Sequence, residues 1–312
     1  MSSYLRLWRT HLICFLALAS LNTQAAYDLY GRIAIDSKSI SKTYEGTKSD
    51  IENDESKIGL KGKFIINPNS KAAVIYQIEY GIDPVDGKAR GDDGTFKQRN
   101  TFIGLQGNFG TIFAGTHDSA FKKSQLKVDL FNDLSPDIKN ILHGENRLED
   151  FLGYTSPTFK KYFSATVNNI KNPFPGGQNY QSHSMHYKGD KFQAALAVDH
   201  EMQGYDSRRA SFSYPFKNSR LGFIIQETKK LSTNQSKSGG VISFSKPIQA
   251  KGTLKLQYAK SSMKIASGAH STIGYDHQLT KHLKFFTFYS KLTSDVVSKN
   301  KNIFSLGLEY QF

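Results

Sequence analysis

Cysteine is almost absent from this chain of 312 residues, which contains only Cys14. Cys14 lies in an N-terminal segment that we expect to be removed, so the mature chain has no cysteine. A disulfide framework and a thiolate metal site are therefore both excluded. An exported chain without disulfides must be held together either by a large core or by a lipid bilayer.

Long apolar runs are also missing, apart from one near the N-terminus. Arg6 and Arg9 precede an apolar run at 12–21, about half of the ~20 residues that a membrane-spanning helix needs. Small residues then occupy Thr23 and Ala25, the two positions before a cut that signal peptidase inspects. This order is typical of a secretory signal peptide. We therefore expect residues 1–25 to be removed and residues 26–312 to form one exported domain.

Catalytic and metal-binding motifs are lacking too. The chain has no His-Glu-x-x-His pattern, no Gly-x-Ser-x-Gly turn and no Gly-x-x-x-x-Gly-Lys phosphate loop. His183 and His186 are three residues apart, so on a strand they would point to opposite faces. Asp92-Asp93 and Asp199-His200 resemble the pairs of outer-membrane aspartyl-type proteases, but such neighbours are expected by chance in a chain with this much aspartate. We expect no catalytic residue, no metal, no cofactor and no nucleic-acid partner.

Aromatic side chains, in contrast, are abundant in an otherwise polar sequence. Hydrophobic residues make up only 38% of the chain, yet aromatic residues make up 12%, with 16 Tyr and 22 Phe. A disordered chain of this polarity would lack the aromatic residues. A transmembrane β-barrel has this composition, because its lumen is polar and only its outer band is apolar.

Apolar and polar residues alternate from Tyr27 to the end of the sequence. The final segment is the clearest, because Phe304, Leu306, Leu308, Tyr310 and Phe312 fall on one face of a strand. The pattern predicts an all-β fold, a transmembrane antiparallel barrel of about sixteen strands whose connections are alternately short and long. We interpret Lys42–Asn53 as one of the polar loops.

One connection is far longer than the others. Two strands meet at a tight Asn-Phe-Gly turn near residue 109, and about thirty residues with little strand pattern then precede Arg147, two to three times the usual upper size of a loop. Nine large apolar residues make this segment too hydrophobic for a solvated linker. They are Phe121, Leu126, Val128, Leu130, Phe131, Leu134, Ile138, Ile141 and Leu142. The segment must therefore pack against another part of the chain.

Several short motifs, in order along the mature chain, resemble the Gram-negative general diffusion porins, which are trimeric barrels of sixteen strands. The motifs are Asp28-Leu29-Tyr30-Gly31-Arg32, 57–62, 99–105, 107–111, 147–157, Leu279-Thr280-Lys281 and 306–312. The resemblance implies a homotrimer that crosses the cell outer membrane many times and lets small hydrophilic solutes and ions diffuse passively. It also implies contact with lipopolysaccharide, and a terminal aromatic, Phe312, that the barrel-insertion machinery reads.

In this family the loop after strand five folds into the lumen and faces a ladder of basic residues on the wall. The resemblance assigns 118–146 to that constriction loop. It places the basic ladder at Arg32, Lys57, Arg99 and Arg147, and the opposing carboxylates at Asp129 and Asp133. The chain departs from the family at Thr116 and His117, where an arginine is common, and its loop carries Lys122, Lys123, Lys127 and Lys139.

Small residues on the first five strands would let neighbouring barrels of a trimer approach closely. We expect Gly31, Gly62 and Gly104 to face outward and to fulfil this role.

Charge predicts the selectivity. Without Arg6 and Arg9, 39 of the 41 basic residues remain against 27 acidic ones, a net charge of about +12. Four ladder cations opposed by two or three loop carboxylates leave an excess of one or two charges. A unit charge ~7 Å from an ion in a water-like dielectric contributes roughly 0.6 kcal/mol, and salt screens it beyond ~8 Å. We therefore expect a modest, several-fold anion preference.

Other functions are compatible with a barrel. A channel specific for phosphate or a sugar, a surface adhesin and an outer-membrane protease barrel are the alternatives. An aromatic track along the lumen would favour a sugar channel, and one dominant long loop would favour an adhesin. Neither feature is evident in the sequence.

Overall fold

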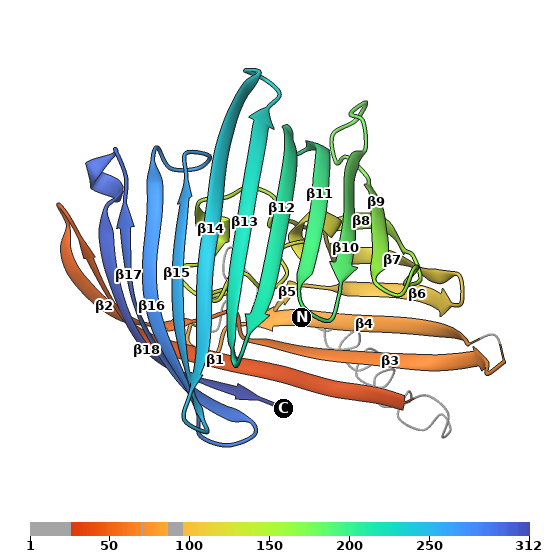
Figure 1. The fold of residues 1–312 in the computed structure, drawn as a ribbon, viewed down its shortest axis with the longest axis horizontal. Coiled ribbons are helices and arrows are strands. Elements are labelled where there is room, and N and C mark those ends of the chain that lie inside the picture. The colour runs from red at the N-terminus through yellow and green to blue at the C-terminus, as the bar shows by residue number, and fades with distance from the viewer. Residues whose placement is uncertain (1–25, 70, 87–95) are drawn as a thin grey trace, which may run out of the picture.

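The computed structural model describes residues 26–69, 71–86 and 96–312 (Figure 1). The predicted signal peptide, 1–25, and the Asp92-Asp93 pair lie outside the described residues. The strands are β1 (Ala26–Lys42), β2 (Gly46–Asn53), β3 (Lys57–Asn67), β4 (Ala72–Ile82), β5 (Phe96–Gln98), β6 (Thr101–Gly107), β7 (Gly110–Asp118), β8 (Arg147–Thr155), β9 (Phe163–Ile170), β10 (Tyr180–Lys188), β11 (Gln193–Met202), β12 (Tyr205–Phe216), β13 (Ser219–Lys230), β14 (Gln235–Ile248), β15 (Gly252–Ser261), β16 (Gly268–Gln278), β17 (Leu283–Thr293) and β18 (Lys301–Gln311). Within these described residues the helices are short: α2 (Ala120–Lys123), η2 (Ile138–Asn140) and η3 (Val297–Lys299).

The described strands form one antiparallel sheet that closes on itself. Of the eighteen strands, β2 and β3 both pair with β1, and β5 and β6 both pair with β4, so each of these two pairs is one interrupted strand and the barrel has sixteen. Closure comes from β1 and β18, which pair from Arg32↔Gln311 to Lys42↔Lys301. The predicted barrel of about sixteen strands is confirmed.

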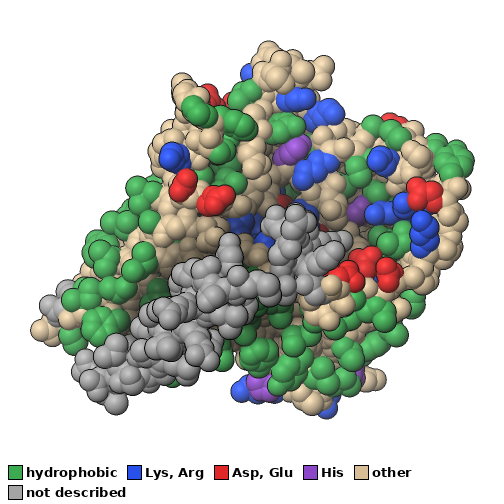
Figure 2. Space-filling model, turned by 180° about the vertical axis from the view of Figure 1, so that it is seen from behind, with side chains coloured by type: hydrophobic (Ala, Val, Ile, Leu, Met, Phe, Trp, Pro, Cys, Tyr) green, Lys and Arg blue, Asp and Glu red, His purple; other side chains and the backbone are tan. Residues whose placement is uncertain are grey.

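The two faces of the strands differ as the alternation predicted. On β11, for example, Leu196 and Val198 are exposed while Ala195, Ala197 and Asp199 are buried. Figure 2 shows hydrophobic side chains over the lower flanks of the molecule and charged side chains higher up, around a hollow. The exposed apolar face is the outer face of the barrel, which suits hydrocarbon rather than water. In the described ranges, no helix combines the length and the apolar character that crossing a membrane requires.

Connections between consecutive strands alternate between two ends of the barrel. One end carries most of the longer connections, including 119–146 and 262–267, and the other carries short turns such as 108–109 and 217–218. We call these the loop end and the turn end.

The interpretation of Lys42–Asn53 as a loop was wrong. β1 and β2 form a hairpin that pairs from Ile35↔Asn53 to Lys42↔Gly46, with a turn at 43–45. Most side chains of β2 are exposed, so this part of the hairpin has no apolar face to bury. Alternation of apolar and polar residues cannot reveal strands that are polar on both faces.

The expectation for the three glycines needs correction. Gly104 has the wrong phase, because it is buried between the exposed Ile103 and Leu105 and lies against Phe113 of β7. Gly31 and Gly62 are on the outer phase, but the rings of Phe312 and Tyr76 occupy the space beside them. Side chains of the same barrel therefore fill these gaps.

The apolar residues of 119–146 pack against strands of the barrel, as we expected from the number of such residues in this segment. Val128, Ile138, Ile141 and Leu142 form one cluster with β13–β15, and Phe131 and Leu134 form another with β17 and β18. The wall residues of these clusters are Ile224, Val241, Ala259, Met263, Phe286, Phe288 and Ile303.

Candidate functional site

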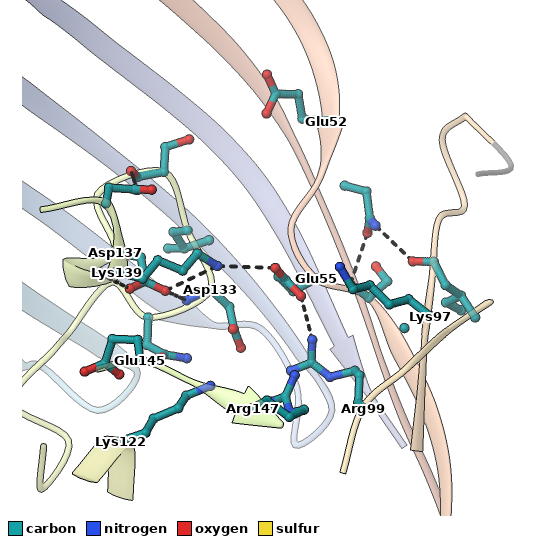
Figure 3. Close-up of a pocket in the computed structure, with 18 of the residues that line it drawn as sticks. Glu52, Glu55, Lys97, Arg99, Lys122, Asp133, Asp137, Lys139, Glu145 and Arg147 are labelled. Carbon is teal, nitrogen blue, oxygen red and sulfur yellow. Dashed lines mark hydrogen bonds and ion pairs between the residues drawn. The ribbon is translucent and has the colours of Figure 1, made fainter. Parts of the chain in front are cut away.

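Two large cavities share a small set of charged residues. The first, of about 890 Å³, includes residues near the loop end such as Leu292 and Lys301, and the second, of about 950 Å³, includes residues near the turn end such as Asp190 and Arg220. Five residues line both cavities, and we call them the neck. They are Arg99, Lys122, Asn132, Asp133 and Arg147. Figure 3 shows the four charged residues of the neck around the first cavity.

The two interrupted strands are interrupted beside the neck. Arg99 lies in the gap between β5 and β6, and Glu55 lies in the gap between β2 and β3 with a φ of 58°. This left-handed conformation is unusual for a residue with a side chain. Arg99 Nη1 lies 2.5 Å from Glu55 Oε2, so each gap supplies one member of an ion pair.

Arg99 is almost completely buried among carboxylates. Its Nε lies 2.9 Å from Glu79 Oε1, and Glu79 also accepts from Lys57 Nζ at 3.0 Å and from the Tyr30 hydroxyl at 2.9 Å. Glu79 therefore connects two cations of the predicted ladder. Lys57 lines the second cavity and is not part of the neck.

Arg147 has a similar environment on β8. Its Nε lies 3.0 Å from Asp118 Oδ1 and 3.0 Å from Asn100 Oδ1, and Lys122 Nζ lies 3.0 Å from the same Asp118 oxygen. Asp118, at the end of β7, thus holds two neck cations. Neither Asp118 nor Lys122 was among the site residues predicted from the sequence.

Arg32 contacts the long connection directly. Its guanidinium lies 2.8 Å from Glu309 of β18 and 3.6 Å from Asp133. Each predicted ladder cation therefore has a carboxylate partner, and of the four only Arg99 and Arg147 meet at the neck. Asp133 is the predicted loop carboxylate that faces them.

Asp129, the other predicted carboxylate, does not face the neck cations but lies buried within the connection. It is buried and accepts hydrogen bonds from the backbone N–H groups of Phe131 and Ile138 and from Gln257 Nε2. Burial, together with the nearby carboxylate of Asp137, raises the pKa of Asp129 well above its usual range. Asp129 therefore organises the connection and adds less negative charge to the second cavity than an exposed carboxylate would.

A second contact joins the connection to the wall on the other side of the neck. Lys139 Nζ lies 3.3 Å from Glu55 Oε1 and 3.5 Å from Asp137 Oδ2 (Figure 3). Although burial opposes it, the carboxylates of Asp137, Glu55 and Asp133 raise the pKa of Lys139 above its ordinary value. Glu55 thus links Arg99 on the wall to Lys139 on the connection.

Arg209 of β12 contacts both ends of the connection, and it was not among the residues predicted from the sequence. Its Nη2 lies 2.7 Å from Glu145 Oε1 and donates to the His143 carbonyl at 3.3 Å. Its Nη1 donates to the Phe121 carbonyl at 3.4 Å, and the guanidinium lies 4.4 Å from the centre of the Phe121 ring.

Three wall glycines leave room for apolar side chains of the connection. A Cβ at Gly222 would lie 3.0 Å from Val128, one at Gly239 would lie 2.7 Å from Leu142, and one at Gly274 would lie 2.7 Å from Phe131. Real Cβ contacts are longer than this. These glycines therefore allow the connection to approach β13, β14 and β16 closely.

His117, where the resembled family commonly has an arginine, is packed among aromatic rings. Its ring centre lies 4.9 Å from that of Phe102, 4.8 Å from that of Phe113 and 5.7 Å from that of Phe151. Thr116 accepts a hydrogen bond from Gln98. Both residues therefore support the wall rather than supply charge.

The charges around the cavities are uneven. Six acidic and six basic side chains line the first cavity, whereas five acidic and eight basic ones line the second. The neck has three basic residues and one acidic residue. Four basic residues of the second cavity have no carboxylate within ion-pair distance among the described residues: Lys123, Lys127, Lys188 and Arg220. The positive charge is therefore concentrated toward the turn end.

The enzymatic alternative finds little support in the described residues. Asp199 is buried, while His200 is exposed on the opposite face of β11 and pairs with Asp206 at 3.0 Å. Adjacent residues on one strand cannot share a substrate in this arrangement. In the part of the chain that the structure describes, no group of three or more His, Cys, Asp or Glu residues could hold a metal ion.

Comparisons with known proteins agree with this architecture. A family model described as Gram-negative porin matches residues 12–296. The major outer membrane protein P.IB of Neisseria gonorrhoeae is 27% identical over 218 residues, which cover 64% of this chain and 59% of that relative, less than two thirds of its length.

Solved structures resemble the whole barrel. The anion-selective porin from Comamonas acidovorans has a TM-score of 0.76 and 19% identity, covering 92% of this chain and 100% of that one. OmpF of Salmonella typhi, in complex with daunomycin, has a TM-score of 0.76 and 17% identity, covering 93% of this chain and 98% of that one. At these identities the likeness establishes the fold.

Proposed function

Because the chain belongs to the Gram-negative porin family, whose barrels lie in the outer membrane, we propose that it forms a water-filled channel for the passive diffusion of small hydrophilic solutes and ions. The observation that carries the proposal is the neck, where a cavity toward the loop end and a cavity toward the turn end meet at five shared residues. A passage lined on both sides by charged side chains favours hydrated solutes.

We further propose that 118–146 is an inward-folded constriction loop. Its apolar side chains pack on Ile224, Val241 and Ala259, which lie on the strand face opposite to the exposed apolar band. Its polar residues Lys122, Asn132 and Asp133 line the neck. This division of the segment into a packed side and a polar side fits a loop that narrows the passage.

The proposed ion selectivity is a modest preference for anions. The neck cations are largely compensated, since Arg99 pairs with Glu55 and Glu79, and Arg147 shares Asp118 with Lys122. The excess of three basic side chains in the second cavity then decides the sign. A unit charge ~7 Å from an ion in water contributes roughly 0.6 kcal/mol, and salt screens it, so we expect a preference of only several-fold. The anion-selective porin from Comamonas acidovorans, similar in fold, is consistent with this sign.

Reversal potentials in planar lipid bilayers test the proposal. We expect the purified protein to conduct, to prefer chloride over potassium in a KCl gradient, and to prefer it more strongly at lower salt. Replacing Arg99 and Arg147 with glutamine should weaken or reverse the preference. A cation-selective wild type would show that the carboxylates dominate, and an absence of conductance would refute the channel itself.

Solute uptake separates a general channel from a specific one. In liposomes that contain the protein, swelling rates should fall smoothly with the size of an uncharged solute. Saturation by phosphate or by one sugar would instead support a substrate-specific channel.

We also propose that the protein is a homotrimer in contact with lipopolysaccharide, as the family resemblance implies, and that Phe312 is its insertion signal. The Phe312 ring is partly exposed beside Gly31 on the outer face, and the backbones of these two residues exchange hydrogen bonds of 2.9 and 3.1 Å. A trimeric mass in mild detergent, lost on heating, is the expected result. A monomeric mass would contradict the trimer, and normal assembly of a Phe312→Ser variant would contradict the signal.

A further inference from the structure

A third cavity, of about 490 Å³, opens beside the first one at the loop end. It lies between the end of the long connection, the facing parts of β11 and β12, and Lys264 in the β15–β16 connection. Lys139, Asn140 and Glu145 line both this cavity and the first one. No neck residue lines it. We call it the side pocket, because a solute in the first cavity can reach it without passing the neck.

The side pocket contains a buried carboxylate that lacks a charged partner. Asp199 is 3% exposed, and among the described residues only the Ser182 hydroxyl, which faces it across the strand pair, offers its carboxylate a hydrogen bond. No basic side chain of the described residues lies within ion-pair distance of it. The Ser182 hydroxyl oxygen also accepts from the Phe121 N–H.

An isolated buried carboxylate is costly, and a folded protein normally gives such a group a partner. Arg209, which is close in the sheet, is already engaged with Glu145 and Gln226. The unfilled acceptor positions of Asp199 therefore suit a donor that comes from outside the chain. A ligand with an ammonium group supplies several such donors.

The rest of the pocket offers a cation and an aromatic surface. Lys264 Nζ donates to the Lys139 carbonyl at 2.6 Å and has no carboxylate within ion-pair distance among the described residues. The rings of His143 and Tyr205 are stacked, with centres 4.2 Å apart. Burial, and the positive charges of Lys264 and Lys237, lower the pKa of His143 to about 4, so its ring is neutral near pH 7.

We propose that the side pocket binds a zwitterionic amino acid, with its ammonium group on Asp199, its carboxylate toward Lys264 and its side chain against the His143–Tyr205 pair. The volume lies within the range of small-molecule sites, which is about 300–1,000 Å³. A metal ion fits the pocket less well, since the described residues contain no group of three suitable ligands. The inference does not rest on conduction, because the pocket and the neck share no residue.

Isothermal titration calorimetry on the full-length protein in detergent tests the inference with three related probes. L-Phenylalanine carries both charges, phenethylamine carries only the ammonium group, and 3-phenylpropionate carries only the carboxylate. We expect L-phenylalanine to bind most tightly, by about tenfold or more over either analogue, because each charge-assisted hydrogen bond is worth at least that factor. Absence of L-phenylalanine binding, or equal binding of all three probes, would overturn the proposal.

Three variants assign the two ends of the ligand. Asp199→Asn should weaken L-phenylalanine and phenethylamine about tenfold and leave 3-phenylpropionate unchanged. Lys264→Gln should weaken L-phenylalanine and 3-phenylpropionate and leave phenethylamine unchanged. Lys260→Gln, which changes an exposed lysine of β15 outside the pocket, is the matched control and should alter none of them.

Heat-resistant migration on gels and unaltered single-channel conductance show whether each variant is folded. Lys264 lies in a surface connection, so the Lys264→Gln result decides the matter even if Asp199→Asn does not fold. If L-phenylalanine binds equally to wild type and Lys264→Gln, the assignment of the pocket is wrong. Normal conductance without binding would overturn this inference alone, whereas binding without conductance would overturn the channel proposal alone.

Discussion

Arg209 and Glu145 form an ion pair of 2.7 Å from which water is almost excluded, since their side chains are 0% and 4% exposed. One residue belongs to β12 and the other to the end of the long connection. Because Arg209 also contacts Phe121 at the start of that connection, a single wall side chain joins both ends of the segment. The neck residues Lys122, Asn132 and Asp133 lie between those ends.

Loss of this arginine should loosen the connection. Arg209→Met leaves the Glu145 carboxylate buried without a partner, and breaking a buried pair in this way costs about 3–5 kcal/mol. We expect a lower midpoint of urea unfolding in lipid vesicles and faster hydrogen exchange over 119–146. The double variant Arg209→Met/Glu145→Met should recover most of the loss. Arg208→Met, whose side chain is 77% exposed, is the control and should have little effect.

The close approach of Phe131 to β16 predicts a steric effect. In Gly274→Ala the new methyl group would lie 2.7 Å from the Phe131 ring, and overpacking of this kind costs about 1–3 kcal/mol. The urea midpoint should fall. Phe131→Leu in the same chain removes the ring and should restore part of the loss. Equal stability of Gly274→Ala and wild type would mean that Phe131 does not pack against β16.

Lys122 should contribute to selectivity although it belongs to no predicted ladder. Lys122→Gln removes one neck charge and leaves Asp118 to Arg147 alone. The charge attracts chloride and repels potassium by roughly 0.6 kcal/mol each, so its loss should lower the ratio of chloride to potassium permeability by up to about eightfold, measured as a shift of the reversal potential. Lys217→Gln, at an exposed position in the β12–β13 turn, should leave it unchanged. An unchanged ratio in Lys122→Gln would place the selective step elsewhere.

His143 should make docking of the connection depend on pH. Burial and nearby lysines lower its pKa to about 4, so the docked state binds fewer protons than a loosened state between about pH 6.5 and 4. Its contribution to docking is thus complete above about pH 6.5 and is lost as the pH falls toward 4. Hydrogen exchange over 138–146, corrected for intrinsic rates, should accelerate in that window.

A variant separates this effect from that of Glu145, for which burial raises the pKa and gives a dependence of opposite sign. The difference between wild type and His143→Gln isolates the histidine. If both proteins respond identically to pH, His143 does not contribute.

The fold could be predicted because alternation is a local property of the sequence. Leu306 and Leu308, for example, are exposed on β18 while Ser305 and Gly307 lie on the other face. Alternation does not indicate a strand whose two faces are chemically alike, as in β2. Gly104 was predicted on the wrong face, because a glycine carries no side chain to show which face it is on.

The site was only partly predictable. Arg99, Arg147 and Asp133 were predicted through motifs or spacing, and all three line the neck. Asp118 and Lys122 escaped because ion pairing depends on which strands are neighbours. Arg209 escaped for the same reason, since its partner Glu145 is 64 residues away in sequence. The adjacent pair Arg208-Arg209 was one available signal. Neighbouring residues on a strand point to opposite faces, so one of the two arginines had to lie on the inner face.

The seam between β1 and β18 has a consequence for how the barrel forms. The hydrogen bond from Arg32 to Glu309 joins residues 277 positions apart. β1 therefore gains its second neighbouring strand only after β18 has been synthesised. Until then both edges of the growing sheet expose unpaired backbone groups, which invite pairing with other chains. Contacts this distant in sequence also form slowly. We therefore expect assembly in vesicles to be limited by the joining of this seam, and a chain shortened before residue 301 to aggregate rather than to form a narrower barrel.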